Sequence, residues 1–185
     1  DYDYYFDIQA CDKIEYMSPK LVGAEKAERG KTPTDTFWIT IVPTNSKEKT
    51  GWPNQKPEKL LNRLISTSCP QNGVVLDFFA GSGTTAQAIL ELNEENGYKH
   101  KFILCTNNES NICEERTLPR IKNVIRGYAG RAGIGGNLKY FKTDFVGSDS
   151  TDKNKRDLVN KSSEMICIKE DVFDLVVDGG LDYRI

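Results

Sequence analysis

The sequence predicts an α/β fold built on a doubly wound, mainly parallel sheet. Residues 74–85 read VVLDFFAGSGTT, an apolar run that ends in an acid and is followed by a glycine turn and a helix start. The run is apolar at each position before the acid, which is typical of a parallel strand buried on both faces. A second apolar run occupies residues 102–106. Strand, helix and strand in this order begin a doubly wound sheet.

The chain before the first strand is expected to contain a lead-in, a short β-prone run and one helix. Residues 1–10 alternate acids with aromatics and suit a cut-off strand or an interaction segment, whereas residues 17–36 read as a loop. Residues 37–42, FWITIV, form the β-prone run. Pro57 suits a first helical position, and the leucine stripe after it predicts an amphipathic helix that stops near Cys69.

The chain after the glycine turn is expected to continue the alternation. A helix is predicted from about residue 85 to residue 93, and the second strand over residues 102–106. Another helix is predicted over residues 111–127, kinked or split at Pro119. A glycine-rich loop then leads to a strand predicted over residues 138–146.

Three parts follow from this reading. They are a lead-in over residues 1–36, a core over residues 37–146 and an appendage over residues 147–185. In the appendage, the polar residues 147–160 are expected to form a surface connection into a short helix.

The composition is that of an ordinary globular chain. Hydrophobic residues make up 38% and charged residues 28%, and no apolar run is long enough to span a membrane. Five scattered cysteines and one histidine make a metal site improbable and suit a reduced, cytoplasmic protein. A net charge of −2 argues against the chain being a dominant DNA-binding surface by itself.

The glycine turn is typical of a nucleotide-type cofactor site. Glycine lets the backbone turn sharply and approach a ligand closely, and the helix start that follows offers unpaired N–H groups. The pattern differs from the dinucleotide fingerprint G-x-G-x-x-G, because Thr84 and Thr85 follow Gly83 and no third glycine comes. The alternative is a tight strand–helix turn that binds nothing.

Two further segments narrow the interpretation. Residues 50–61 read TGWPNQKPEKLL, and residues 101–115 read KFILCTNNESNICEE. Together with the glycine turn, in this order and spacing, they resemble the S-adenosylmethionine-dependent DNA amino-methyltransferases. The likeness covers roughly residues 32–175 and is greatest to the modification (Mod) subunits of type III restriction–modification systems. It implies a Rossmann-like methyltransferase fold, incomplete at its N-terminal side, and methyl transfer from S-adenosyl-L-methionine to N6 of adenine in DNA.

One motif of that family is absent from the sequence. The family carries a (D/N/S)-P-P-(Y/F/W) catalytic motif, and this chain has no Pro-Pro pair. The chain also opens at Asp1 rather than at a methionine. We therefore expect a C-terminal part of a longer enzyme, with no catalytic residues of its own and no methyl transfer by these residues alone.

The resemblance implies which residues bind the cofactor. Asp77 would hold its amino group, with helix capping as the alternative role. The turn would wrap its methionine part, and the end of the second strand would meet its ribose hydroxyls, unless the asparagines there only form turns. The segment before Pro57 would meet its carboxylate, or only start a helix. The residues of these three groups are Phe79, Ala80, Gly81, Ser82, Gly83 and Thr84; Asn107, Asn108 and Glu109; and Asn54, Gln55 and Lys56.

Partners and competing functions also follow from the resemblance. The expected partners are DNA with its target base flipped out, the rest of the same protein, a second copy and a restriction subunit, with no membrane. Cytosine-N4 methylation is the nearest alternative, although residues 138–145 and 164–167 resemble the type III group and favour adenine. Two other classes stay open: an inactive, truncated protein that binds cofactor or associates with DNA, and a dinucleotide-binding α/β protein.

Overall fold

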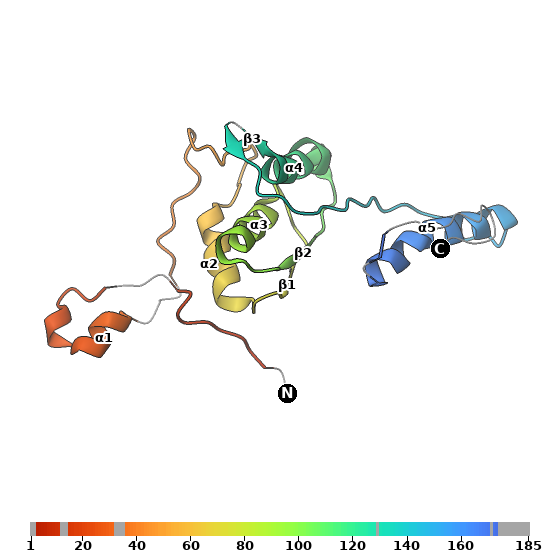
Figure 1. Ribbon diagram of the computed structural model, residues 1–185. Coiled ribbons are helices and arrows are strands. Elements are labelled where there is room, and N and C mark those ends of the chain that lie inside the picture. The colour runs from red at the N-terminus through yellow and green to blue at the C-terminus, as the bar shows by residue number, and fades with distance from the viewer. Residues whose placement is uncertain (1–2, 12–14, 32–35, 129, 171, 174–185) are drawn as a thin grey trace. The chain divides into compact units, whose positions relative to one another are not determined.

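A computed structural model gives the structure of residues 3–11, 15–31, 36–128, 130–170 and 172–173 (Figure 1). The chain divides into two compact units, Asp1–Leu138 and Lys139–Ile185. The candidate site lies wholly in the first unit. Among the described helices, none has both the length and the apolar character needed to cross a membrane. The predicted three-part division of the chain stays a prediction.

Two parallel strands form the centre of the first unit. Strand β1 (Val74–Asp77) pairs with β2 (Lys101–Leu104), with Val74 opposite Lys101 and Asp77 opposite Leu104. Parallel neighbours need a crossover connection, and helix α3 (Thr84–Asn96) supplies it. The predicted strand, glycine turn, helix and second strand are therefore confirmed, and α3 is one turn longer than predicted.

Helix α3 lies at the centre of the core, and two helices pack against it (Figure 1). Helix α2 (Glu58–Ser68) packs on one side of α3, and α4 (Leu118–Arg126) packs on another. Ala86 and Ala88 of α3 are fully buried, so their small side chains let the neighbouring helices and strands approach closely. Two apolar clusters result: one contains Ile65, Ala88, Ile89 and Leu92, and the other contains Ala86, Leu90, Ile121 and Val124.

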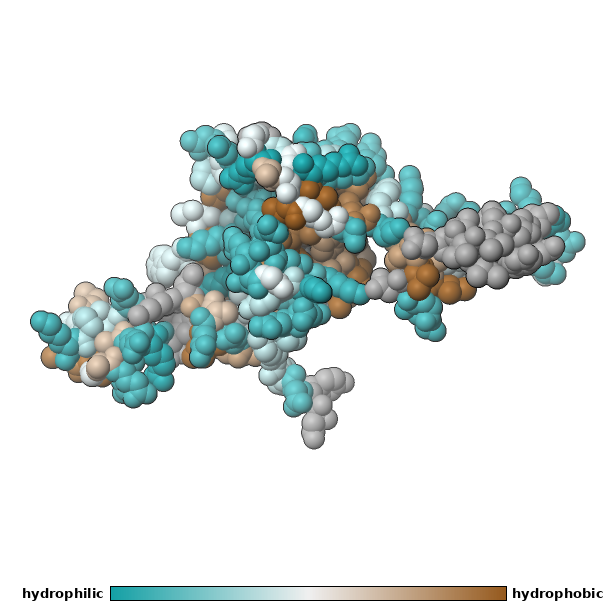
Figure 2. Space-filling model, in the orientation of Figure 1, coloured by the Kyte–Doolittle hydropathy of each residue, from teal (hydrophilic) through white to brown (hydrophobic). Residues whose placement is uncertain are grey.

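The strands are covered on one face only within the described residues. Val75 and Phe102 pack against the helices, whereas Val74, Leu76 and Ile103 are 50–57% exposed. Figure 2 shows hydrophobic residues reaching the surface of this unit. The prediction that β1 is buried on both faces is therefore wrong for this structure, because both strands are apolar on two faces but helices cover one of them.

Two predicted strands are wrong. Residues 37–42 and 138–146 form no strand, and Trp38, Ile41 and Phe145 lie more than four-fifths exposed. A β-prone run needs a neighbouring strand for its N–H and C=O groups, and neither run has one in the described structure.

The other differences concern helices and turns. The predicted loop at residues 17–36 contains a short 3₁₀ turn (Pro19–Leu21) and helix α1 (Ala24–Arg29). The appendage contains α5 (Asp152–Glu170), which is 19 residues long rather than short. Small strands β3 (Gly127–Tyr128) and β4 (Arg131–Ala132) pair where a loop was predicted.

The helix predicted over residues 111–127 winds in three ways. It begins as a 3₁₀ turn (Glu109–Asn111), continues as a π-helical turn (Cys113–Thr117) and ends as α4. Pro119 occupies the start of α4, where a missing N–H costs little, so it marks the change of winding instead of kinking a regular helix.

Candidate cofactor site

Asp77 ties the end of β1 to the start of α3. Its Oδ1 accepts a hydrogen bond from the Phe79 N–H at 2.9 Å, and its Oδ2 accepts one from Thr85 Oγ1 at 2.6 Å. Neither bond comes from a backbone N–H of α3, whose N-cap is Gly83, so Asp77 fixes the turn without capping the helix itself. A carboxylate oxygen accepts more than one bond, so half-buried Asp77 keeps the capacity to receive an ammonium group.

The turn between β1 and α3 requires glycine at two positions, for two reasons. Gly81 and Gly83 have φ of +50° and +78°, a left-handed conformation that side chains disfavour. A Cβ on Gly83 would also lie 3.0 Å from Thr117 Cγ2. The turn is closed by the Gly83 N–H, which donates to the Ala80 carbonyl at 2.7 Å.

Thr117 holds the turn from the π-helical segment. It is buried, and its Oγ1 donates to the Gly81 carbonyl at 2.6 Å. The sequence does not predict this role, because a threonine inside a helical pattern carries no signal of its own. Its partner lies 36 residues away in the chain, and folding alone brings them together.

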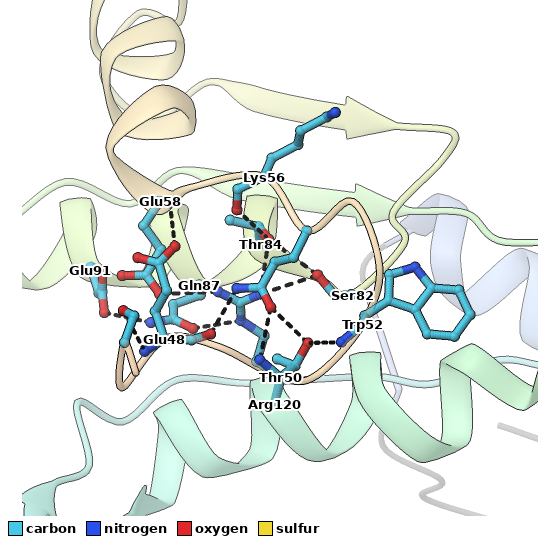
Figure 3. Close-up of polar contacts among 12 residues, drawn as sticks. Glu48, Thr50, Trp52, Lys56, Glu58, Ser82, Thr84, Gln87, Glu91 and Arg120 are labelled. Carbon is cyan, nitrogen blue, oxygen red and sulfur yellow. Dashed lines mark hydrogen bonds and ion pairs between the residues drawn. The ribbon is translucent and has the colours of Figure 1, made fainter. Parts of the chain in front are cut away.

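Arg120 of α4 is the second residue of the site whose role the sequence does not predict. Its guanidinium donates to Gln87 Oε1 at 2.7 Å, Thr84 Oγ1 at 2.9 Å, Glu58 Oε1 at 3.0 Å and Ser82 Oγ at 3.3 Å. Figure 3 shows this network between the start of α2, the glycine turn and α4. The side chain of Arg120 is 5% exposed. A buried guanidinium requires such partners, because an unpaired buried charge is costly.

Glu58 is an unusual member of the network. Burial and, after it, the neighbouring carboxylates of Glu91 and Glu48 together raise the pKa of its carboxyl to about 7, against the opposing effect of Arg120. Glu48 also accepts a hydrogen bond from the Glu58 N–H at 3.3 Å, so its carboxylate caps the start of α2.

The segment Asn54–Pro57 approaches the turn from α2. Thr84 Oγ1 donates to the Lys56 carbonyl at 3.3 Å, which joins the segment to the start of α3. Asn54 and Lys56 are exposed, and the Lys56 side chain extends away from the network (Figure 3). The two sides of the predicted site are therefore brought together by a hydrogen bond from the Thr84 side chain to the Lys56 backbone.

Gln55 stabilises its own loop. Its Oε1 accepts from the N–H and the Oγ1 of Thr50, both at 2.8 Å, and its Nε2 donates to the Glu48 carbonyl at 2.7 Å. Both ends of the amide are thus used within residues 48–55. Contact of Gln55 with a cofactor carboxylate stays a prediction, and in this conformation the amide is already engaged.

The end of β2 lies at the same edge as the glycine turn. The Ala80 N–H donates to the Cys105 carbonyl at 3.1 Å. Asn108 Oδ1 accepts from the Cys113 N–H at 2.9 Å, and Asn107 Oδ1 accepts from the Glu109 N–H at 3.2 Å. The two asparagines therefore form the turns and caps that were the alternative to ribose binding, and Glu109 is exposed.

Two hollows of about 390 Å³ each lie elsewhere in the first unit. One is lined by Glu48, Glu58 and residues of α2, and the other by residues of the lead-in together with His100, Tyr98 and Leu92. Neither is lined by a predicted cofactor residue. Of the predicted residues, Phe79, Asn107 and Glu109 are exposed, whereas Ala80, Ser82, Gly83 and Thr84 are buried. The glycine turn lies at the carboxyl ends of β1 and β2, which is where parallel α/β sheets bind ligands.

A model of the DNA methylase family matches residues 5–160. The chain belongs to the DNA methylase family. The match includes both strands, the glycine turn and the segment before α2.

Three relatives are similar in sequence to parts of this chain. The type III restriction–modification enzyme StyLTI Mod subunit of Salmonella typhimurium is 42% identical over 82 residues, which are 40% of this chain and 13% of that protein. The EcoP15I Mod subunit of Escherichia coli is 52% identical over 50 residues, 27% of this chain and 8% of that protein. The type II methyltransferase M.ScaI of Streptomyces caespitosus is 36% identical over 91 residues, 45% of this chain and 30% of that protein.

The predicted likeness to Mod subunits is confirmed by these matches. The chain spans less than a third of the length of each of these three relatives.

Proposed function

We propose that this chain is the S-adenosyl-L-methionine-binding part of a DNA methyltransferase of a restriction–modification system, acting on N6 of adenine. The observation that carries the proposal is the fixed acid at the end of β1, followed by a glycine turn that enters α3 directly. In a chain of the DNA methylase family, this arrangement suits a cofactor with an ammonium group and a carboxylate.

The donors and acceptors present fit that cofactor. The Asp77 carboxylate suits the ammonium group, and a Cβ on Gly81 would meet one atom only, at 3.7 Å, so its backbone is open to close approach. Phe79 is 92% exposed and offers an apolar surface at the same edge. Asn107, Asn108 and Glu109 are polar groups of the kind that meet ribose hydroxyls. Asn54, Gln55 and Lys56 complete the proposed set.

The work of these residues is binding and orientation. When bound, S-adenosyl-L-methionine would supply an electrophilic methyl group to the base nitrogen, which loses a proton, and the thioether S-adenosyl-L-homocysteine would be the leaving group. The residues of β1, the turn and α3 would hold the methionine end so that the methyl group faces the base, which removes much of the entropic cost of the encounter. The target base must leave the duplex to reach it.

We propose that residues 1–185 do not methylate DNA by themselves. The sequence has no Pro-Pro pair and therefore no (D/N/S)-P-P-(Y/F/W) motif to bind the amino group of the base. The proposed partners are accordingly the residues that carry this motif, DNA, a second copy and a restriction subunit, in a cytoplasmic protein. Cytosine-N4 transfer and an inactive, cofactor-binding protein are the alternatives.

Calorimetric titration tests the proposal. We expect the chain to bind S-adenosyl-L-methionine and not NAD⁺, and Asp77→Asn to weaken binding about tenfold or more, because it removes one charge-assisted contact. Asp149→Asn, which changes an exposed acid of the other unit, should leave affinity unchanged. Equal affinity in Asp77→Asn and the unaltered chain, or no binding to either, would contradict the proposal.

A further inference from the structure

We propose that Arg120 is a positioning residue that holds the glycine turn and the Asn54–Pro57 segment in the places that cofactor binding requires. This inference rests on the proposed function. Arg120 would raise the affinity for S-adenosyl-L-methionine by fixing the residues that bind it, without contacting the cofactor itself.

The guanidinium of Arg120 donates hydrogen bonds to both sides of the proposed site. Nη1 donates to Thr84 Oγ1 at 2.9 Å and to Ser82 Oγ at 3.3 Å, and both of these residues belong to the glycine turn and the start of α3. Nη2 donates to Glu58 Oε1 at 3.0 Å, and Glu58 is the first residue of α2. Glu58 directly follows the Asn54–Pro57 segment, so fixing its side chain fixes the end of that segment.

Thr84 connects Arg120 to the Asn54–Pro57 segment. Its Oγ1 accepts from Arg120 and donates to the Lys56 carbonyl at 3.3 Å. A hydroxyl that accepts one hydrogen bond from a fixed guanidinium has its own proton directed elsewhere, here to Lys56 (Figure 3). The orientation of Thr84, and hence its hold on the segment, depends on Arg120.

The pattern of contacts is specific to arginine. Nε bonds Gln87, Nη1 bonds the turn and Nη2 bonds Glu58, which uses three directions of one planar group. A lysine ammonium keeps the charge but is a compact point with no such fork. Arg120→Lys therefore removes the geometry and leaves the charge.

The packing of α4 does not depend on the guanidinium of Arg120. Helix α4 is anchored to α3 through Ile121 and Val124, which lie in an apolar cluster with Ala86 and Leu90. That cluster contains neither Arg120 nor its partners. The helix should therefore stay folded when the guanidinium is replaced.

Hydrogen exchange and calorimetry on the full chain test the inference. In Arg120→Lys we expect faster amide exchange in residues 50–56 and 81–85, unchanged exchange in β2, and an affinity for S-adenosyl-L-methionine about tenfold lower, the effect of one well-formed polar contact. Arg126→Lys, an exposed arginine of the same helix, is the matched control and should change neither. Unchanged exchange in both segments would overturn the inference.

The two proposals fail in different ways. If the unaltered chain does not bind S-adenosyl-L-methionine, the proposed function fails, and exchange alone decides whether Arg120 positions the two segments. If Arg120→Lys does not fold, Glu58→Gln replaces it, because this change keeps the size of the side chain and removes its charge. Faster exchange confined to residues 50–56 in Glu58→Gln would support the inference, and unchanged exchange there would refute it.

Discussion

The glycine turn and the Asn54–Pro57 segment are the two sides of the proposed site, and they are held differently. Residues 82–90, which begin in the turn and continue into α3, are buried without a break. Asn54 and Lys56 are exposed, and their segment is held by the Gln55 amide and the contact between Thr84 and the Lys56 carbonyl. Changes in the turn should therefore cost folding stability, and changes in the segment should mainly cost affinity.

The largest effect is expected at Gly83. Gly83→Ala puts a side chain at φ +78° and brings its Cβ 3.0 Å from Thr117 Cγ2. Strain and overlap together should lower the free energy of unfolding by roughly 2–3 kcal/mol. Gly97→Ala is the control, because Gly97 has φ +69° with no atom within 4 Å of its Cβ, and should cost about 1 kcal/mol. Equal losses in denaturant titrations would show that contact with Thr117 does not matter.

The next effect concerns the pH dependence of stability at Glu58. Burial, with Glu91 and Glu48 nearby, raises the pKa of this carboxyl from 4.5 to about 7 in the folded chain. Between these values the folded state binds a proton that the unfolded state does not, so stability should fall as pH rises through this window and level off above it.

Glu58→Gln tests this sign. Relative to Glu58→Gln, the unaltered chain should lose on the order of 1–2 kcal/mol between pH 5 and pH 8. Exposed Glu95→Gln should follow the unaltered profile. If the unaltered chain instead lost stability relative to Glu58→Gln as the pH fell, the attraction of Arg120 would outweigh burial.

A smaller effect is expected at Gln55, where stability and affinity can be told apart. Gln55→Ala removes three hydrogen bonds of the loop and should cost about 1 kcal/mol. Thr50→Val removes one of the same bonds, so the double variant should lose less than the sum of the two single losses. If Gln55→Ala lowers affinity and Thr50→Val does not, Gln55 binds the cofactor directly.

The smallest effect is expected at Lys56. Its side chain is exposed, so Lys56→Met should leave stability unchanged within about 0.5 kcal/mol. If its charge faces the cofactor carboxylate, affinity should fall a few-fold at low salt, and less at high salt, because exposed charges are screened. Lys59→Met, an exposed lysine of α2, should change neither quantity. An equal fall in both variants would indicate a general charge effect.

The sequence predicts the parts of this unit that local chemistry determines. An apolar run, an acid and two glycines define β1, its turn and the start of α3 without reference to distant residues. Thr117 and Arg120 were missed because the partners that connect them to the turn, α3 and α2 lie 33–62 residues away along the chain, and no sequence pattern marks such contacts. The strand predicted over residues 37–42 is wrong for a related reason, since β propensity does not supply a partner strand.

The central claim is that the carboxyl ends of β1 and β2 bind S-adenosyl-L-methionine. The most direct measurement is an amide chemical-shift titration of the isotope-labelled chain with this compound. The account predicts saturable shifts centred on residues 77–85 and 106–109, with smaller shifts in residues 54–56. Shifts centred instead on the hollow beside His100, or no saturable shifts at all, would contradict it.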